Sequence, residues 1–348
     1  MSSERMMRAM VLERPARAEE GPLILKEVPV PRPGPGEVLV RVETCGVCHT
    51  DLHTVEGELK LPRLPIIPGH QIVGVVAEKG EGAKRFHESE RAGIAWLSSA
   101  CGRCRFCQSG RENLCQSARF TGLDVDGGYA EFAVVQEAFA YKIPKGFSAR
   151  KAAPLLCAGI IGYRALRLSE IRPGGKLGLY GFGASAHLVI QIARHWNCKI
   201  FVLTRSAEHK ELATKLGADW VRSSEDEPPE KLDGAIIFAP VGQLVLYALR
   251  ALDRGGRLAL AGIEMSPIPE MNYREHLYYE RTIRSVTAST RRDGEDFLRL
   301  AEELPLAVET TTFPMERADE ALKLLKEGKM KGAGVLMISD CGVRIAAE

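Results

Sequence analysis

The chain has 348 residues, of which 26% are charged and 45% apolar, and its formal net charge is +2. This length predicts two domains, and the ordinary composition argues against extensive disorder. The sequence lacks the long basic run of a nucleic-acid binder, and no stretch approaches the ~18 apolar residues of a membrane span. Met1–Met10 lacks the apolar segment of a signal peptide. We therefore expect a soluble, cytoplasmic protein with neither a nucleic-acid partner nor a membrane attachment.

The first 150 residues are predicted to be mostly β. Residues 37–43 (EVLVRVE) alternate apolar and polar side chains, which is typical of a half-buried strand. Residues 69–78 and 129–142 also have the composition of strands. Prolines crowd residues 29–35 and 62–68, so these segments are predicted to be loops or turns.

After about Ala152 the pattern changes, because short apolar strands begin to alternate with helical patterns. Strands are expected at 176–180, 199–203, 235–238, 257–261 and 282–287. A helix at 184–196 separates the first two, and helices at 294–303 and 315–327 and a strand at 334–338 close the chain. Alternating strands and helices predict an α/β fold with a doubly wound parallel sheet.

A glycine-rich turn joins the first predicted strand of this half to its helix. Gly181, Gly183 and Ala186 form a G-x-G-x-x-A pattern, in which the glycines permit a tight turn and the approach of a pyrophosphate, and the alanine permits close helix packing. The helix N-terminus adds free N–H groups and a positive dipole end. A purely structural turn is the alternative, but the surrounding βαβ pattern favours dinucleotide binding.

The residues at the end of the next strand indicate which dinucleotide the chain binds. An NAD site usually has an Asp or Glu here for the ribose hydroxyls, whereas this chain has Thr204 followed by Arg205. A carboxylate would repel a 2′-phosphate, while a hydroxyl and a guanidinium can accept one. We therefore expect NADP(H) to be preferred over NAD(H), which remains possible if Arg205 merely faces solvent.

Four cysteines lie within fifteen residues, in the segment 98–118. Four thiolates this close suit a tetrahedral zinc ion with no open position, which is a structural site. A disulfide pair or an iron–sulfur cluster is the alternative. The predicted ligands of this structural zinc are Cys101, Cys104, Cys107 and Cys115.

Three further segments hold metal-ligand side chains: GVCHTDLH at 46–53, PGH at 68–70, and LLCAGI at 155–160. With the cysteine lobe and GFGASA at 181–186, they occur in the order found in the zinc-dependent alcohol dehydrogenases of the medium-chain dehydrogenase/reductase family. The chain resembles this family over essentially its whole length.

The resemblance implies a second, catalytic zinc ion, whose ligands would be Cys48, His70 and Cys157. Thr50 would contact the substrate oxygen and begin a proton relay that continues through the cofactor ribose and ends at His53. Asp51 would orient a zinc ligand, and His49 would lie near the cofactor pyrophosphate. Cys45 lies three residues too early and is interpreted as a bystander.

The chemistry explains this ligand set. Hydride leaves carbon readily only from an alkoxide, whereas a free alcohol keeps its proton. Zinc can lower the pKa of a bound water from 15.7 to ~7. A similar shift for an alcohol is roughly 8 units, or on the order of 11 kcal/mol. Three protein ligands leave the fourth position for the substrate oxygen.

The resemblance also implies an architecture. A mostly β, GroES-like catalytic domain would comprise residues 1–159 and 289–348, and a Rossmann domain residues 160–288. The substrate would be a small molecule, a primary alcohol or its aldehyde. A homo-oligomer is expected, a tetramer more readily than a dimer.

Three positions differ from relatives. Gln71 replaces the glutamate that many relatives have after the zinc histidine, and Leu59 replaces the pocket tryptophan of ethanol-specialised ones. At 332–335 (GAGV) the chain lacks the phosphate-binding arginine of some relatives, for which Arg291 could substitute. The smaller Leu59 favours longer or aromatic alcohols, unless it is an ordinary loop residue. Rival functions are a polyol, cinnamyl-alcohol or formaldehyde-adduct dehydrogenase, a non-catalytic binding protein, and a zinc-independent quinone or enoyl reductase, which would lack the ligand set.

Overall fold

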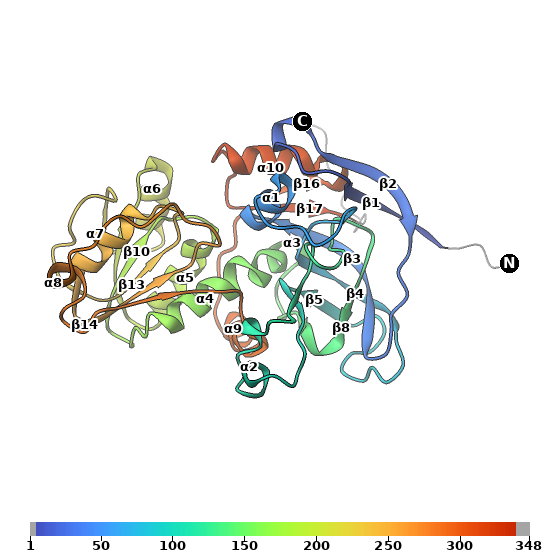
Figure 1. The fold of residues 1–348 in the computed structure, drawn as a ribbon, viewed down its shortest axis with the longest axis horizontal. Helices are drawn as coiled ribbons and strands as arrows, with labels where there is room; N and C mark the ends of the chain where they lie inside the picture. The colour runs from blue at the N-terminus through green and yellow to red at the C-terminus, as the bar shows by residue number, and fades with distance from the viewer. Residues whose placement is uncertain (1–4, 339–348) are drawn as a thin grey trace. The chain divides into compact units, whose positions relative to one another are not determined.

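A computed structural model describes residues 5–338, which fold as two compact units (Figure 1). Unit 1 combines the chain up to Cys157 with the segment that begins at Thr290, and unit 2 is Ala158–Ser289. The fold class is the expected one, a parallel α/β unit combined with a mostly β unit.

The main sheet of unit 1 has seven strands in the order β16-β17-β3-β4-β5-β9, with β8 also paired to β3. The bounds are β3 (Glu37–Val47), β4 (Gln71–Lys79), β5 (Arg91–Ile94), β8 (Phe132–Gln136), β9 (Ala140–Lys142), β16 (Thr310–Pro314) and β17 (Ala333–Met337). The central strand β3 is longer and more buried than its alternating sequence predicts, because β4, β8 and β17 all pair with it.

Shorter elements complete unit 1. Strands β1 (Met6–Leu12) and β2 (Leu23–Pro29) form an antiparallel pair, and β6 (Leu97–Ser99) pairs with β7 (Arg119–Phe120) at the base of the cysteine lobe. The helices are α1 (His49–Glu56), α2 (Arg105–Gln108), α3 (Ala149–Ala152), α9 (Arg291–Glu303) and α10 (Ala318–Lys326). The 3-10 turns are η1 (Ala18–Glu20), η2 (Glu112–Leu114), η3 (Glu137–Phe139), η4 (Ala153–Leu156) and η5 (Met315–Arg317).

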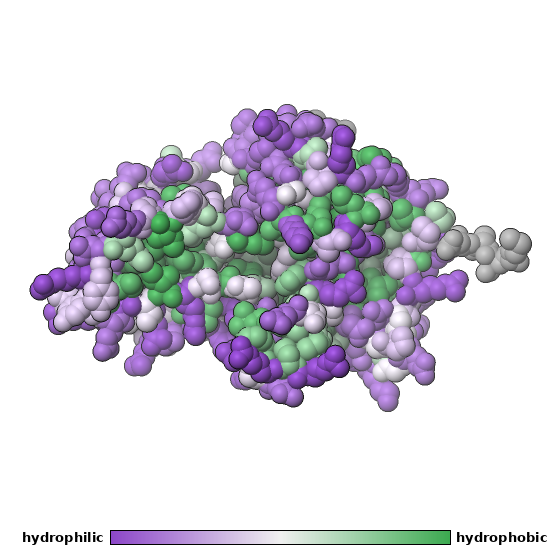
Figure 2. Space-filling model, viewed as in Figure 1, coloured by the Kyte–Doolittle hydropathy of each residue, from purple (hydrophilic) through white to green (hydrophobic). Residues whose placement is uncertain are grey.

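Helix α10 illustrates how unit 1 builds its core. Its apolar residues Ala318, Ala321 and Leu322 recur at helical spacing and join the buried core of this unit. Lys323 and Lys326 of this helix are exposed, and Figure 2 shows hydrophilic side chains over its visible face.

Unit 2 contains one six-stranded parallel sheet in the order β12-β11-β10-β13-β14-β15. Its strands are β10 (Lys176–Tyr180), β11 (Lys199–Leu203), β12 (Trp220–Arg222), β13 (Leu232–Ile237), β14 (Leu252–Leu260) and β15 (Thr282–Ser285), and its helices are α4 (Ala158–Leu168), α5 (Ala184–His195), α6 (Ala207–Lys215), α7 (Gln243–Ala251) and α8 (Tyr273–His276). The strand order reverses beside β10, and dinucleotides bind at such a switch point.

Five of these six strands are predicted by the sequence. The missed strand, β12, has only three residues, none of them fully buried, so its apolar signal is weak. Among residues 5–338, no helix is long and apolar enough to cross a membrane.

Candidate functional site

The pairing of β3 with β4 brings the first two expected zinc ligands together. The register places Gly46 opposite Gln71, so Cys48, just after β3, lies beside His70, just before β4. The Cys48 Sγ and His70 Nε2 atoms are 3.4 Å apart. Side chains 22 residues apart in sequence therefore share one corner of the sheet.

The residue before His70 has to be glycine. Gly69 has a φ of +96°, and a Cβ there would lie 2.4 Å from the ring of the buried Tyr129. Any larger residue would force the chain away from Tyr129 and move His70 with it. This is the structural reason for the glycine of the PGH motif.

The third expected ligand comes from the end of unit 1. Cys157 directly follows η4, which packs against β3, β4 and β5. Its Sγ lies 3.9 Å from that of Cys48, and the ligand atoms of Cys48, His70 and Cys157 all lie within 4.8 Å of one another. Cys45, by contrast, is fully buried, its thiol is directed to the Gly46 carbonyl, and it belongs to neither cysteine cluster.

These distances suit a zinc ion. A tetrahedral zinc with Zn–S bonds of ~2.3 Å and Zn–N bonds of ~2.05 Å has edges of about 3.8 Å between sulfurs and about 3.6 Å between sulfur and nitrogen. The observed separations are 3.9 Å and 3.4 Å. Two thiolates and one imidazole are also ligands that zinc prefers, and they leave one tetrahedral position for another molecule.

The electrostatics of the trio also favour a cation. The contact with Cys157 and then burial raise the pKa of the Cys48 thiol well above its usual range. Burial lowers the pKa of His70, but the charges of Asp51 and Cys48 outweigh it and raise that pKa to about 10. Two thiolates this close repel each other, and a divalent cation between them removes that penalty.

Asp51 connects two of the three ligand residues. Its Oδ2 accepts the Cys48 backbone N–H at 2.9 Å, as part of a capping box at the start of α1, and its Oδ1 lies 3.1 Å from His70 Nδ1. The carboxylate is 2% exposed, so this geometry is well shielded from water. With Nδ1 bound to Asp51, Nε2 of His70 is left for a metal.

The remaining polar residues expected near the catalytic zinc lie on α1. Thr50 and His53 are half-buried and His49 is exposed. The rings of His49 and His53 have centroids 6.4 Å apart. Desolvation, followed by the nearby His53, lowers the pKa of His49.

Trp96 contacts one of the expected ligands, and Leu59 lies beside α1. Trp96 packs edge-on against the His70 ring, with centroids 5.0 Å apart, and it also stacks on Phe120 at 5.1 Å. Leu59 is half-buried just beyond α1, and its backbone N–H donates to the His53 carbonyl at 3.3 Å. A large aromatic group thus lies against His70, while the aliphatic Leu59 lies just past the end of α1.

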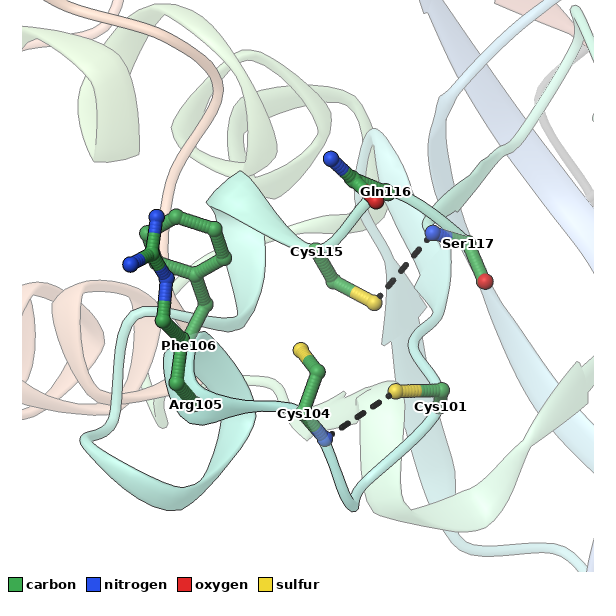
Figure 3. Close-up of a pocket in the computed structure, with 7 residues that line it drawn as sticks. All are labelled: Cys101, Cys104, Arg105, Phe106, Cys115, Gln116 and Ser117. Atoms are coloured by element: carbon green, nitrogen blue, oxygen red, sulfur yellow. Dashed lines mark hydrogen bonds between the residues drawn. The ribbon is translucent and has the colours of Figure 1, made fainter.

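The four-cysteine lobe forms a second cluster. The Sγ atoms of Cys101, Cys104, Cys107 and Cys115 lie within 4.8 Å of one another. Figure 3 shows three of these sulfurs turned toward a common space, with the Cys104 and Ser117 amides donating to cysteine sulfurs at 3.4 Å. Backbone amides lower the pKa of Cys101 to about 6, while desolvation and the contact with Cys104 raise that of Cys107 to about 12. Four sulfurs with backbone N–H support are typical of a closed structural zinc site.

The lobe is anchored by a residue that sequence patterns do not reveal. Glu112 is 3% exposed, and its Oε1 accepts both the backbone N–H and the Nε–H of Arg291, at 2.9 Å and 3.0 Å. The Arg291 guanidinium also lies over the Phe139 ring at 4.9 Å. The sequence suggested Arg291 as a cofactor-phosphate ligand; in the structure its side chain contacts Glu112 of the cysteine lobe and Phe139.

In unit 2, the glycine-rich turn has the geometry of a phosphate site. Gly181 has a φ of +85°, and a Cβ there would lie 3.0 Å from Ala239. Of the described atoms, none lies within 4 Å of a Cβ built at Gly183, the N-cap of α5, and none of the described side chains caps this helix. Ala186 is fully buried. The open space and the uncapped N–H groups can receive a pyrophosphate.

Thr204 and Arg205 follow β11 at the carboxyl edge of the same sheet. Thr204 is buried, and its N–H donates to the Arg222 carbonyl at 3.0 Å, whereas Arg205 is exposed. Ser206 caps α6 by accepting the His209 N–H at 3.3 Å. The strand therefore ends in a hydroxyl and a guanidinium instead of the carboxylate of an NAD site.

Comparison with known proteins identifies two domain families along the chain. Residues 34–145 match the alcohol dehydrogenase GroES-like domain, and residues 186–303 match the zinc-binding dehydrogenase domain. The first segment lies in unit 1, and most of the second lies in unit 2.

Individual relatives extend this similarity over nearly the whole chain. A probable alcohol dehydrogenase, AdhA, of Mycobacterium tuberculosis is 51% identical over 337 residues, which cover 95% of this chain and 97% of that protein. An alcohol dehydrogenase of Geobacillus stearothermophilus is 36% identical, covering 95% and 100%. The crystal structure of AibC superposes with a TM-score of 0.89 at 27% identity, covering 97% of both chains.

Proposed function

This chain belongs to the zinc-type medium-chain alcohol dehydrogenases, and we propose that it is a zinc-dependent, NADP(H)-preferring member that interconverts primary alcohols and aldehydes. One observation carries the zinc dependence. The ligand atoms of Cys48, His70 and Cys157 converge within 4.8 Å in a geometry that suits tetrahedral zinc. A second ion in the four-cysteine lobe gives two zincs per chain.

In the proposed mechanism, Cys48, His70 and Cys157 would hold a zinc ion, which would supply the Lewis acidity that lowers the pKa of the alcohol. Asp51 keeps the Nδ1 proton of His70, so that Nε2 faces the metal. The Thr50 hydroxyl accepts the proton that the alcohol loses while it passes its own proton on along the relay, whose outer end is His53. His49 binds the cofactor pyrophosphate.

The proposed substrates are primary alcohols with longer or aromatic chains. Leu59 stands where ethanol-specialised relatives have a tryptophan, and its half-buried aliphatic side chain lies just past the end of α1. A leucine leaves more room than an indole, so a benzyl group could be accommodated. A polyol, cinnamyl-alcohol or formaldehyde-adduct activity is the alternative that a substrate panel tests.

The proposed NADP(H) preference rests on Thr204 and Arg205. The exposed Arg205 guanidinium can hold a 2′-phosphate through charge-assisted hydrogen bonds, and the buried Thr204 leaves no carboxylate at the end of β11 to repel it. Gly181, Gly183 and Ala186 form the pyrophosphate turn in either case, so NAD(H) should still bind, but less tightly.

We also propose a homotetramer, with a dimer as the smaller alternative. Strand β15 is an edge of the six-stranded sheet and its residues are mostly exposed, so it offers unpaired backbone groups to a second copy. A cytoplasmic location stays a prediction.

The test is oxidation of NADPH and of NADH by the purified protein with benzaldehyde, each with and without a zinc chelator. We expect turnover that favours NADPH and falls with the chelator. Preference for NADH would reject the role of Arg205 while keeping the zinc mechanism. Chelator-insensitive turnover would reject the zinc mechanism. Two bound zincs without turnover on a panel of alcohols, aldehydes and ketones would favour a binding protein.

A further inference from the structure

The chain reverses direction at the end of α1 and carries a carboxylate back to His53. Gly57 ends the helix with a φ of +77°, and a Cβ there would lie 2.9 Å from Pro15, so glycine is required. The next residue, Glu58, donates its backbone N–H to the His53 carbonyl at 2.9 Å. Its side chain then turns onto the imidazole, where Oε2 contacts Nδ1.

Helix α1 and its C-terminal turn therefore provide two carboxylate–imidazole pairs. Asp51, in the first turn, binds Nδ1 of His70, and Glu58, just past the last turn, binds Nδ1 of His53. Asp51 is 2% exposed, whereas the Glu58 side chain is 52% exposed and His53 is 18% exposed. The Asp51–His70 pair is therefore shielded from water, whereas the His53–Glu58 pair is accessible to it.

This contact favours one nitrogen of His53 as the proton acceptor. A neutral imidazole has one N–H donor and one acceptor nitrogen. Only the tautomer with its proton on Nδ1 can donate to the Glu58 carboxylate, and it leaves Nε2 as the acceptor. When Nε2 takes up a proton, the resulting imidazolium lies beside the negative charge of Glu58.

We propose that Glu58 is a positioning residue that fixes the tautomer of His53 and holds it ready to pass a proton between the site and solvent. This inference rests on the proposed function, in which His53 ends the relay. In alcohol oxidation, His53 Nε2 gains one proton from the relay and then loses one to water, so the imidazole returns to its neutral form with no bond formed to Glu58.

The first test is a spectrum of the whole protein labelled with ¹⁵N-histidine, with the His53 signal assigned by its loss in His53→Gln. We expect the Nδ1-protonated tautomer in the wild type and in Glu58→Gln, since the amide oxygen can still accept the N–H. Glu58→Leu should shift His53 toward the Nε2-protonated tautomer. Glu88→Leu, at an exposed acid away from α1, is the matched control and should leave the spectrum unchanged.

The second test is steady-state alcohol oxidation. Glu58→Leu should lower kcat about fivefold, the loss expected for one hydrogen bond, with little change in KM for the alcohol. Glu58→Gln should recover most of this loss. In a His53→Gln background, Glu58→Leu should have no further effect, because the two residues act as one unit.

The proposed relay and the proposed role of Glu58 can be rejected separately. If His53→Gln leaves kcat and the solvent isotope effect unchanged, the proposed relay is wrong. If His53→Gln slows oxidation but Glu58→Leu changes neither the tautomer nor kcat, the relay stands and the role of Glu58 is overturned. The tautomer measurement needs no activity, so it also decides the positioning of His53 on its own.

Discussion

The carboxylate of Asp51 lies 3.1 Å from Nδ1 of His70, and both side chains are almost completely buried. The same carboxylate accepts the backbone N–H of Cys48. A single residue that binds no metal itself therefore orients two residues of the proposed zinc site. This arrangement predicts that the metal site can be weakened without changing any of its ligands.

Asp51→Asn should lower the zinc affinity of the Cys48–His70–Cys157 site by about 10- to 100-fold, because a neutral amide binds the imidazole N–H more weakly. The measurement is zinc content after equilibration with increasing chelator. One zinc per chain should leave early, while the zinc of the four-cysteine lobe serves as an internal reference. Asp226→Asn, an exposed change in unit 2, is the control. The prediction would be wrong if Asp51→Asn kept both zinc ions at the same chelator concentrations as Asp226→Asn.

Arg205→Gln should raise the KM for NADPH by about 10- to 100-fold, the equivalent of one charge-assisted hydrogen bond to phosphate, and leave the KM for NADH nearly unchanged. The measurement is benzaldehyde reduction over a range of each cofactor. Lys215→Gln, which removes another exposed cation at the far end of α6, should change neither value. A similar rise for both cofactors would mean that Arg205 does not read the 2′-phosphate.

Cys104→Ser should release one zinc per chain and destabilise the fold. In the described lobe, residues 98–118, the buried side chains are few and mainly polar, so metal binding must supply much of its stability. A loss of about 2 kcal/mol would lower Tm by roughly 4–8 °C. Cys198→Ala, which removes a buried cysteine outside both clusters, should keep two zincs. An unchanged zinc content in Cys104→Ser would reject the structural site.

The raised pKa of Asp319 predicts that Asp319→Asn stabilises the protein more at high pH than at low pH. Burial raises its pKa to about 6, although the Leu23 N–H opposes this shift. Because the folded state binds the proton more tightly than the unfolded state, the contribution of Asp319 is greatest below about pH 4 and is lost as the pH rises through 6. Asp319→Asn removes the half-buried charge, so it should stabilise unit 1 at pH 8 by on the order of 1 kcal/mol, and by less at pH 5.

The measurement is the difference in Tm between Asp319→Asn and the wild type at pH 5 and at pH 8. The gain should be larger at pH 8. Glu302→Gln, at an exposed position of α9, should show the same small difference at both values. An equal gain at both pH values for Asp319→Asn would show that the carboxylate carries no burial penalty.

Several features follow from local sequence alone. The parallel unit was predictable because strand and helix periodicities are local, and β10, α5 and β11 begin at the predicted residues. The cysteine lobe was equally readable, since its four sulfurs lie within fifteen residues and can meet without any distant contact. The glycine-rich turn joins adjacent elements and needs no other part of the chain.

Other features were decided only by tertiary structure. Cys48, His70 and Cys157 lie far apart in sequence, and only the β3–β4 register and the packing of η4 bring their ligand atoms together. Glu112 and Arg291 are separated by 179 residues, so no pattern could pair them. The sequence determined which chemical groups this protein has available. Folding decided which of them meet, because each long-range contact depends on strand order and register, which local propensities do not encode.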